Sequence, residues 1–524
     1  MINFYKTSIA LLAIFLLTTA NSEVTVDHEQ VPEIANLQLA PEEQISELLF
    51  EKNLEVPSDN IETLSVLPDE IESKRIQSAK FKIQLEQPEN SKKPEIGKPE
   101  VAKKRTTNSI VKIITNDMGV KIYHMEDNSS PIIHLALSFK NSGSAYQEKN
   151  KAGIPKLYSA TTFCGCGSYS QSQFEQNISN ISSEILCISN MDCISFFLTA
   201  PTIVLEDAVS LLQTAIYQPQ FEKEKFLLIQ NSLVAGIQNY AINPVMSATE
   251  IFLPSIIFKS HPYENGVYGS SEDIAKLTIA DLLKYKEEHL IINNAEACIF
   301  GDVSEEKAKS IVSKLLKNLK KEKKTCKHVP EVVPDISNTI KHYYAEGPQS
   351  TIVLAMKNKR VKSPNRYAAK ILSRILGERH LFRGRIIEVL RTKLGLIYSG
   401  AVMNVDFKHS GYLLGILSTD NSKVEQAISA IREIIKDMKE NGITQEELDF
   451  AKKNISGSLL VELRTSNDML KFFYTAMKLD LAATALSDLL DGIENVSLSD
   501  VKEVSKKIFD ENNIAIVVIG GNNK

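Results

Sequence analysis

The 524-residue chain repeats itself, and this internal duplication constrains its fold more than any other feature of the sequence. The segment LEDAVSLLQTAI, which starts at Leu205, shares its helical pattern of apolar positions with VEQAISAIREII, which starts at Val424. The same shift of 219 residues aligns IAKLTIADL with IENVSLSDV, and it carries Asn294 onto Asn513 and Gly301 onto Gly520. Gap-free matches at one offset predict two tandem copies of a domain of about 200 residues, an ordinary domain size.

Both copies show the same order of expected elements. Opening strands precede a helix, more strands, an amphipathic helix, a second long helix and a closing strand. The segment KIITNDMGVKIYHM predicts a hairpin that turns at residues 116–119, PIIHLALSF predicts the next strand, and AEACIFG and IAIVVIG predict the closing strands. Strands and helices mix without strict alternation, which indicates an α+β fold: two homologous domains, each a mixed, mainly antiparallel sheet with helices on one face.

Charge and proline content mark the domain boundaries. The segment KKEKKTCKHVPEVVPD, residues 320–335, predicts a solvated linker between an N-terminal domain at 106–319 and a C-terminal domain at 336–524. Residues 23–105 are acidic, rich in lysine and poor in aromatic residues. Such a segment buries too little apolar surface to offset the entropy cost of ordering it, so we expect a disordered tether there.

The first 22 residues predict export. Lys6 precedes a short apolar run that ends near Leu17, and small residues follow around Ala20, which is the pattern of a cleaved signal peptide. The mature chain is therefore expected to be periplasmic or secreted, with no stable membrane span after cleavage. The alternative is an N-terminal membrane anchor, since the cleavage-site rule is loose.

Composition excludes one class of partner, and the cysteines leave two states open. A formal net charge of −5 without a dominant basic block argues against a sequence-independent nucleic-acid interface. All six cysteines lie beyond the signal, where disulfides are permitted. Cys187 and Cys193 flank the turn-like SNMD and are placed to face each other across a hairpin, whereas Cys164-Gly-Cys166 lacks the second pair that a structural zinc site needs. We expect buried or disulfide-bonded thiols.

The duplicated body resembles the pitrilysin/insulinase family of zinc peptidases, in particular its bacterial, mitochondrial-processing-peptidase-like branch. The resemblance covers roughly residues 108 to 522 and rests on GVKIYHMEDNSSPIIHLALSFKNSGSAYQEKNKAG, SHPYENGVYGSSEDIAKLT and LRTKLGLIYSG. In that family, a helix after the Lys-Ala-Gly stretch carries His-x-x-Glu-His, and a further glutamate follows on a later helix. Histidines at i and i+4 share a helical face and hold zinc, while the intervening glutamate activates a water as general base.

This sequence departs from that motif at each position. The aligned stretch GIPKLYSATTF places Lys156 and Ala160 at the histidine positions and Ser159 at the position of the base, and Gly236 stands where the later glutamate is expected. None of these side chains is a usual zinc ligand, so we expect no metal and no other cofactor in this chain. Lys156 is either a solvated helix lysine or a fixed positive charge in the vacated site.

Arg391 and Tyr398 are the polar pair that remains to be explained. In LRTKLGLIYSG, Arg391 ends a helix and Tyr398 begins the next strand; the apolar positions of the helix are Ile386, Ile387, Leu390 and Leu394. One interpretation is structural, with a helix-terminal cation and a packed strand tyrosine. The family resemblance implies instead that Arg391 holds a substrate carbonyl and that the Tyr398 hydroxyl stabilises an oxyanion.

The sequence favours a non-catalytic subunit of an exported, heterodimeric zinc metallopeptidase. By the family resemblance, two halves close over a peptide substrate, and some members place the zinc helix and the Arg/Tyr pair on separate chains. This chain would then supply Arg391 and Tyr398 to a catalytic partner of the same fold that carries the zinc. One alternative is a degenerate homologue that binds peptides or scaffolds a complex without proteolysis. The least favoured alternative is an independently active metalloendopeptidase.

Overall fold

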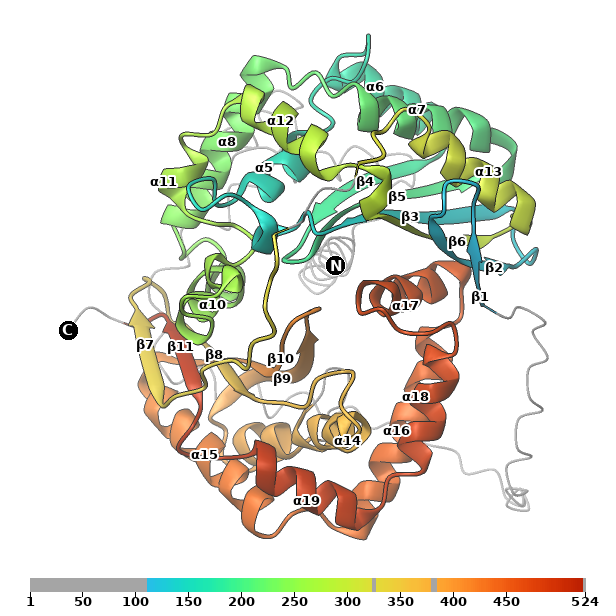
Figure 1. The fold of residues 1–524 in the computed structure, drawn as a ribbon. Helices are drawn as coiled ribbons and strands as arrows, with labels where there is room; N and C mark the ends of the chain where they lie inside the picture. The colour runs from blue at the N-terminus through green and yellow to red at the C-terminus, as the bar shows by residue number, and fades with distance from the viewer. Residues whose placement is uncertain (1–110, 323–326, 378–383, 522–524) are drawn as a thin grey trace, which may run out of the picture. The chain divides into compact units, whose positions relative to one another are not determined.

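The computed structural model describes residues 111–322, 327–377 and 384–521 (Figure 1). The expected signal peptide at 1–22, the expected tether at 23–105 and Cys326 lie outside these ranges. Each of the two domain copies contributes one sheet. We call residues 111–319 the first half and residues 336–521 the second half. None of the described helices is long and apolar enough to cross a membrane.

The first half holds a six-stranded sheet in the order β1-β2-β6-β3-β5-β4. Its strands are β1 (Lys112–Thr115), β2 (Lys121–Glu126), β3 (Ile132–Lys140), β4 (Glu184–Ser189), β5 (Cys193–Pro201) and β6 (Ala295–Gly301). β2 runs parallel to β6, and every other neighbouring pair is antiparallel. β1 and β2 form the predicted hairpin, in which the Asn116 side-chain oxygen accepts hydrogen bonds from the backbone NH groups of Met118 and Val120. Asparagine favours such turns because its side chain can bind its own backbone.

The second half holds a five-stranded sheet in the order β7-β11-β8-β10-β9. Its strands are β7 (Thr339–Tyr343), β8 (Gln349–Lys357), β9 (Ile397–Asp406), β10 (Gly411–Asp420) and β11 (Ala515–Ile519). β7 runs parallel to β11, and the remaining pairs are antiparallel. Without β1, the first sheet has the same strand order and the same directions. The duplicated α+β architecture predicted from the 219-residue shift is therefore confirmed.

Two glycines related by that shift show why the same residue is found at equivalent positions of the two copies. Gly301 and Gly520 close equivalent strands with φ angles of 121° and 139°, a region that L side chains rarely adopt. A Cβ atom on Gly301 would lie 2.1 Å from the carbonyl oxygen of Ile132, and one on Gly520 would lie 2.5 Å from the Ser350 hydroxyl oxygen. Backbone conformation and close approach both require glycine at these positions.

The helices of each half cover one face of its own sheet (Figure 1). The main helices of the first half are α5 (Ile154–Thr161), α6 (Gln171–Asn180), α7 (Leu205–Tyr217), α8 (Lys223–Gln238), α11 (Ser271–Ile274), α12 (Ile279–His289) and α13 (Glu305–Leu316). Those of the second half are α14 (Arg366–Gly377), α15 (Val424–Glu440), α16 (Gln445–Glu462), α18 (Ala485–Glu494) and α19 (Leu498–Ile508). The repeated helices bury the apolar positions that their period predicts, which are Leu205, Ala208, Val209, Leu212, Ala215 and Ile216 in α7 and Val424, Ala427, Ile428, Ile431, Ile434 and Ile435 in α15.

The opposite face of each sheet is covered by a helix from the other half. Helix α17 (Ser466–Lys478), from the second half, packs Phe473 and Met477 onto Phe300 and other residues of the first sheet. The second sheet is covered by three consecutive segments of the first half. These are α9 (Pro244–Ser247), the π-helical segment η4 (Ala248–Phe252) and α10 (Leu253–Ile257). Within that contact the ring of Phe252 stacks on Tyr343, with centroids 3.7 Å apart. Each half therefore completes the core of the other.

The β9–β10 turn and the linker add polar contacts between the halves. The backbone NH of Lys408, in that turn, donates to the Asp192 carboxylate at 2.9 Å, and the same carboxylate accepts a hydrogen bond from the Tyr263 hydroxyl at 2.6 Å. The Val332 NH donates to the His409 carbonyl, and Val329 is buried. Most of the described residues of the predicted linker are exposed, and Val329 and Pro334 are buried.

The cysteines correct one expectation and confirm another. Cys187 on β4 is paired across the sheet with Phe196 and not with Cys193, so the two thiols do not face each other as predicted. The reason is register: the turn SNMD places Ser189 opposite Ile194. The described cysteines are all free thiols, and four of them are buried: Cys164, Cys166, Cys193 and Cys298.

Candidate functional site

Helix α5 presents three of the four positions at which the family motif would place its catalytic residues. It begins directly after the Lys-Ala-Gly stretch, and Pro155 in its first turn suits a helix start because the missing NH has no intrahelical partner there. Leu157, Tyr158 and Thr161 bury one side of the helix. α5 packs on α8, which carries Gly236, and on β4, the edge strand of the first sheet. The fold therefore brings together the elements that carry the four degenerate positions.

None of these positions offers a zinc ligand. The Lys156 ammonium lies over the ring of Tyr268, 4.7 Å from its centroid. The Ser159 hydroxyl is buried, 2.9 Å from the Lys156 carbonyl oxygen and 3.2 Å from the Ser189 hydroxyl on β4. Ala160 is exposed, and a Cβ atom added to Gly236 would meet nothing within 4 Å. An ammonium, a hydroxyl, a methyl group and an empty position do not fit Zn²⁺, which prefers imidazole, thiolate and carboxylate ligands.

The remaining described residues do not provide a substitute site. Within residues 111–322, 327–377 and 384–521, no group of three or more His, Cys, Asp and Glu side chains is placed to hold a metal ion. The loss of the motif is thus not offset by ligands recruited from elsewhere in this part of the chain.

Two residues near Lys156 were missed by the sequence reasoning. Tyr268 supplies the aromatic face under the ammonium, and Glu250, in η4, lies close enough for the two charges to interact. Burial raises the pKa of Glu250, and the positive charge of Lys156 opposes that rise. The signal for Tyr268 was present in the motif SHPYENGVYGSSEDIAKLT, but no sequence pattern links Glu250 to a helix almost 100 residues earlier. Lys156, which stands where the family motif would place its first histidine, therefore has a phenol ring and a carboxyl group as neighbours.

Arg391 lies in a π-helical segment, η7 (Ile387–Lys393), that follows α14 in the second half. The widened turn is defined by the Leu394 NH, which donates to the Val389 carbonyl five residues earlier at 3.0 Å. Leu390 is fully buried and anchors the segment, whereas Arg391 is exposed. π-helical turns are rare and occur frequently at functional sites. Leu394 was predicted to share the apolar face but is 53% exposed, because the widened turn shifts it away from that face.

Tyr398 lies at an irregularity in the edge strand β9. In the pairing of β9 with β10, Ile397 faces Thr419 and Ser399 faces Ser418, so Tyr398 is the extra residue of a β-bulge. Its side chain is 52% exposed. Bulges occur often beside active sites, where they re-aim a side chain.

The connection between Arg391 and Tyr398 is firmly held. The Leu396 NH donates to the Leu390 carbonyl at 2.6 Å, the Leu396 carbonyl accepts from the Thr419 hydroxyl at 2.5 Å, and Lys423 donates to the Gly395 carbonyl at 3.0 Å. Both exposed side chains thus project from a junction with a well-defined backbone. The predicted order of helix end, glycine turn and strand start is confirmed.

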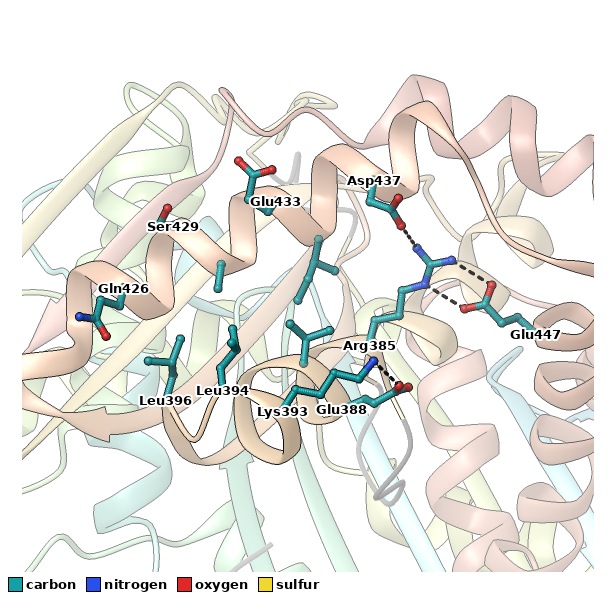
Figure 2. A pocket seen from close by; sticks show the side chains of 13 residues that line it. Arg385, Glu388, Lys393, Leu394, Leu396, Gln426, Ser429, Glu433, Asp437 and Glu447 are labelled. Atoms are coloured by element: carbon teal, nitrogen blue, oxygen red, sulfur yellow. Dashed lines mark hydrogen bonds and ion pairs between the residues drawn. The ribbon is translucent and has the colours of Figure 1, made fainter.

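A groove of about 720 Å³ lies between η7 and α15, and Arg391 is not among the residues that line it (Figure 2). Its floor is apolar, and most of its charged groups are paired with one another. The Arg385 guanidinium binds Glu447 at 2.8 and 2.9 Å and Asp437 at 2.6 Å, and Lys393 binds Glu388 at 2.8 Å. Because most of the charges in the groove already have partners, we assign the groove a structural role and place the candidate site at the residues described above.

Comparison with known proteins shows the family of this chain. A family model described as Insulinase (Peptidase family M16) matches residues 122–271, and one described as Peptidase M16 inactive domain matches residues 276–455. The chain belongs to peptidase family M16. Its relatives include a protein named non-peptidase homolog YmxG from Helicobacter pylori, 22% identical over 411 residues, which cover 78% of this chain and 94% of that protein. A protein named uncharacterized zinc protease YmxG from Bacillus subtilis is 20% identical over 415 residues, covering 79% and 99%.

Solved structures show that the M16 fold extends over the described body. A structure of a peptidase M16 inactive domain from Pseudomonas fluorescens superposes with a TM-score of 0.72 at 22% identity, covering 79% of this chain and 98% of that one. A structure of a protease from Helicobacter pylori superposes with a TM-score of 0.70 at 18% identity, covering 78% and 99%. With the substitutions on α5 and α8, this M16 chain is a degenerate peptidase homologue.

Proposed function

We propose that this chain is a non-catalytic subunit of an exported M16 peptidase that presents Arg391 and Tyr398 to a peptide bound at the zinc of a partner chain. The observation that carries the proposal is the pair itself. Both side chains are exposed, and both come from irregular backbone, a π-helical turn and a β-bulge, that buried neighbours hold in place. Irregular backbone costs stability, and it persists where a side chain must be aimed.

The chemistry of the pair suits a peptide in its transition state. An Arg guanidinium offers several donors in a fixed plane and binds a carbonyl oxygen in a defined direction. A Tyr hydroxyl is a neutral donor that can stabilise the negative charge that develops on a carbonyl oxygen during hydrolysis. Zinc held by the partner would supply the hydroxide, which the four degenerate positions of this chain do not support.

The proposal names the partner by its chemistry: a chain of the same fold with an intact His-x-x-Glu-His helix. The test begins with purification of the tagged, full-length protein from its native cell and identification of the chains that copurify. The expected result is an M16 chain that carries the motif, and a complex that cleaves peptides while neither chain does so alone. Copurification without any such chain, or full activity of the zinc-bearing chain alone, would contradict the proposal.

A second candidate function is peptide binding without proteolysis, and one observation favours it. β4 is the last strand of the first sheet, so one of its edges has no strand partner among the described residues. Leu186 and Ile188, at alternating positions of β4, are 48% and 42% exposed. A free edge with exposed apolar side chains is a surface to which an extended peptide can add as a further strand. Under this candidate, the chain would hold peptides or bring proteins together as a scaffold.

A further inference from the structure

We propose that Thr419 positions Tyr398 for its role in peptide hydrolysis, because the Thr419 hydroxyl fixes the β-bulge from which Tyr398 projects. The inference rests on the proposed function, in which the Tyr398 hydroxyl stabilises an oxyanion at the zinc of a partner chain. Thr419 lies on β10 and is fully buried, so its own side chain is out of reach of a substrate. It is therefore a positioning residue, which acts only through the residues that it holds.

The alternation of side chains along β9 changes phase at Tyr398. In a regular strand, residues two positions apart point to the same face, so Tyr398 would share the face of Gly400 and Val402. Val402 is buried in the core of the second half, and a Cβ atom on Gly400 would lie 3.1 Å from the Ile397 Cδ1 atom. Ile397 is buried in the same core although it is an odd number of positions from Val402. The bulge thus gives the buried face to Ile397 and leaves Tyr398 52% exposed.

The Thr419 hydroxyl supplies a contact that the strand ladder does not provide. Pairing between β9 and β10 begins with Ile397 opposite Thr419, so Leu396 lies outside the ladder. The Thr419 hydroxyl donates to the Leu396 carbonyl at 2.5 Å, and the Leu396 NH donates to the Leu390 carbonyl at 2.6 Å. Leu396 is only 9% exposed, and a buried carbonyl that loses its donor is costly. The hydroxyl therefore favours the bulged register over a regular one.

The first copy of the domain lacks both the hydroxyl and the bulge. The shift of 219 residues that relates the copies places Thr419 on Ala200, which is fully buried in β5. The strand beside β5 is β4, which begins with Glu184 opposite Thr199 and pairs with β5 in one continuous register. The copy that carries Tyr398 thus has a threonine where the other copy has an alanine.

The structural test measures the exposure of Tyr398 independently of activity. The full-length wild-type and variant chains are treated with tetranitromethane, which nitrates accessible tyrosine rings, and then digested with trypsin. Tyr398 is the only tyrosine in the tryptic peptide that follows Lys393 and ends at Lys408, so mass spectrometry reports its nitration alone.

Thr419→Val keeps the shape of the side chain and removes the hydroxyl. It should slow the nitration of Tyr398 by about threefold or more, because a strand that loses its bulge turns this side chain to the buried face. Tyr344, which is 42% exposed, is the internal reference and should be nitrated at the wild-type rate. Thr419→Ser keeps the hydroxyl and should leave the nitration of Tyr398 unchanged.

Thr161→Val is the matched control. Thr161 is also fully buried, and its hydroxyl donates to the Leu157 carbonyl at 2.7 Å, but it lies on α5 of the first half. This variant should lower the thermal stability about as much as Thr419→Val and leave the nitration of Tyr398 unchanged. The comparison separates the loss of a buried hydrogen bond in general from the loss of the bond at the bulge.

The kinetic test uses the complex with the zinc-bearing partner. Thr419→Val should lower kcat by on the order of 100-fold, which is the effect of misplacing a reacting group by about 1 Å. KM should stay near the wild-type value, because Arg391 is held by η7. In the Tyr398→Phe background, Thr419→Val should cause no further loss, since Thr419 acts through the Tyr398 hydroxyl. Thr419→Ser should retain the wild-type rate.

Each alternative outcome has a distinct meaning. Equal nitration of Tyr398 in Thr419→Val and in the wild type would overturn the inference, while a slow Tyr398→Phe complex would still support the proposed function. A further loss of activity from Thr419→Val in the Tyr398→Phe background would also overturn it, because Thr419 would then act on the complex in general. Full activity of the Tyr398→Phe complex would contradict the proposed function, and the catalytic importance of Thr419 would be lost with it.

Discussion

The hydroxyl groups of Tyr474 and Ser195 lie 2.9 Å apart although the two residues are 279 positions apart in the chain. Tyr474 is on α17 of the second half, and Ser195 is on β5 of the first. The contact belongs to the exchange in which α17 covers the first sheet and α10 covers the second. The two halves therefore belong to one compact unit, although the sequence predicts two domains.

Removing a large side chain from α17 should destabilise the sheet of the other half. Phe473 is 1% exposed and packs against Phe300 and Tyr123. Phe473→Ala is expected to lower the free energy of unfolding by roughly 3–5 kcal/mol, because a cavity replaces buried ring contacts. Hydrogen exchange followed by mass spectrometry should show lost protection in β3 and β6 as well as in α17.

Phe450→Ala is the control for this prediction, since Phe450 is on α16 and is 40% exposed. It should cost far less than Phe473→Ala. Loss of protection that stays within the second half would show that the halves fold independently, which would contradict the mutual completion of their cores.

Zinc binding should follow the identity of the degenerate positions. The wild-type chain, loaded with zinc and desalted, should retain no stoichiometric metal by elemental analysis, because an ammonium and an apolar side chain do not coordinate zinc. The triple variant Lys156→His, Ala160→His and Gly236→Glu should bind about one zinc per chain, since three protein ligands suffice for a catalytic-type site. Gly236 tolerates a side chain because an added Cβ contacts nothing within 4 Å.

The double-histidine variant without Gly236→Glu is the matched control and should hold zinc more weakly. One tightly bound zinc in the wild-type chain would be incompatible with the degenerate site and would require ligands outside the described residues.

Tyr398→Phe should lower peptide turnover of the proposed heterodimer without preventing its assembly. Loss of one oxyanion donor costs on the order of 100- to 1000-fold in rate, or about 2.7–4 kcal/mol of transition-state stabilisation. Arg391→Ala should also raise KM, because a carbonyl contact already made in the ground state is lost. Quenched fluorescent peptides provide the assay, and size-exclusion chromatography checks the complex.

Both side chains are exposed, so neither substitution should alter the stability of the isolated chain by more than roughly 0.5 kcal/mol. If both variants cleave peptides at the wild-type rate, Arg391 and Tyr398 have a structural role only. Reduced assembly with unchanged activity per complex would place the pair in the subunit contact instead.

Asp406 should make the folded state more stable as the pH falls from 7 to about 4. Burial at the end of β9 raises the pKa of this carboxyl group from its ordinary value of 3.8 to about 6. Between these two values the native state binds the proton and the unfolded state does not, so acidification favours the native state. The difference corresponds to at most on the order of 3 kcal/mol.

Asp406→Asn should therefore be more stable than the wild type at pH 7.5, and the difference should shrink or reverse at pH 4. Chemical denaturation at both pH values measures this. An equal effect at the two values would show that Asp406 is not titrating in this range.

The helix and strand order of this chain could be predicted from its sequence because periodicity and turn chemistry act over a few residues. The apolar faces of α7 and α15, the hairpin at 116–119 and the junction between η7 and β9 all depend on local spacing. The duplication could be predicted for the same reason, since equivalent residues such as Gly301 and Gly520 both adopt a positive φ angle that favours glycine. The loss of the zinc ligands on α5 is also a property of residue identity alone.

Only the tertiary structure showed which helices and strands of the two halves pack against one another. Contacts between residues far apart in the chain determine the exchange of α10 and α17, the position of Lys156 beside Tyr268 and Glu250, and the burial of Val329 in the linker. The π-helical turn that exposes Leu394 and the bulge at Tyr398 depend on how neighbouring elements meet. A sequence pattern gives the period of an element and the face it will bury. The sequence pattern does not say which other element will cover that face. That pairing depends on how the whole chain removes its apolar surface from water, so it involves all elements at once.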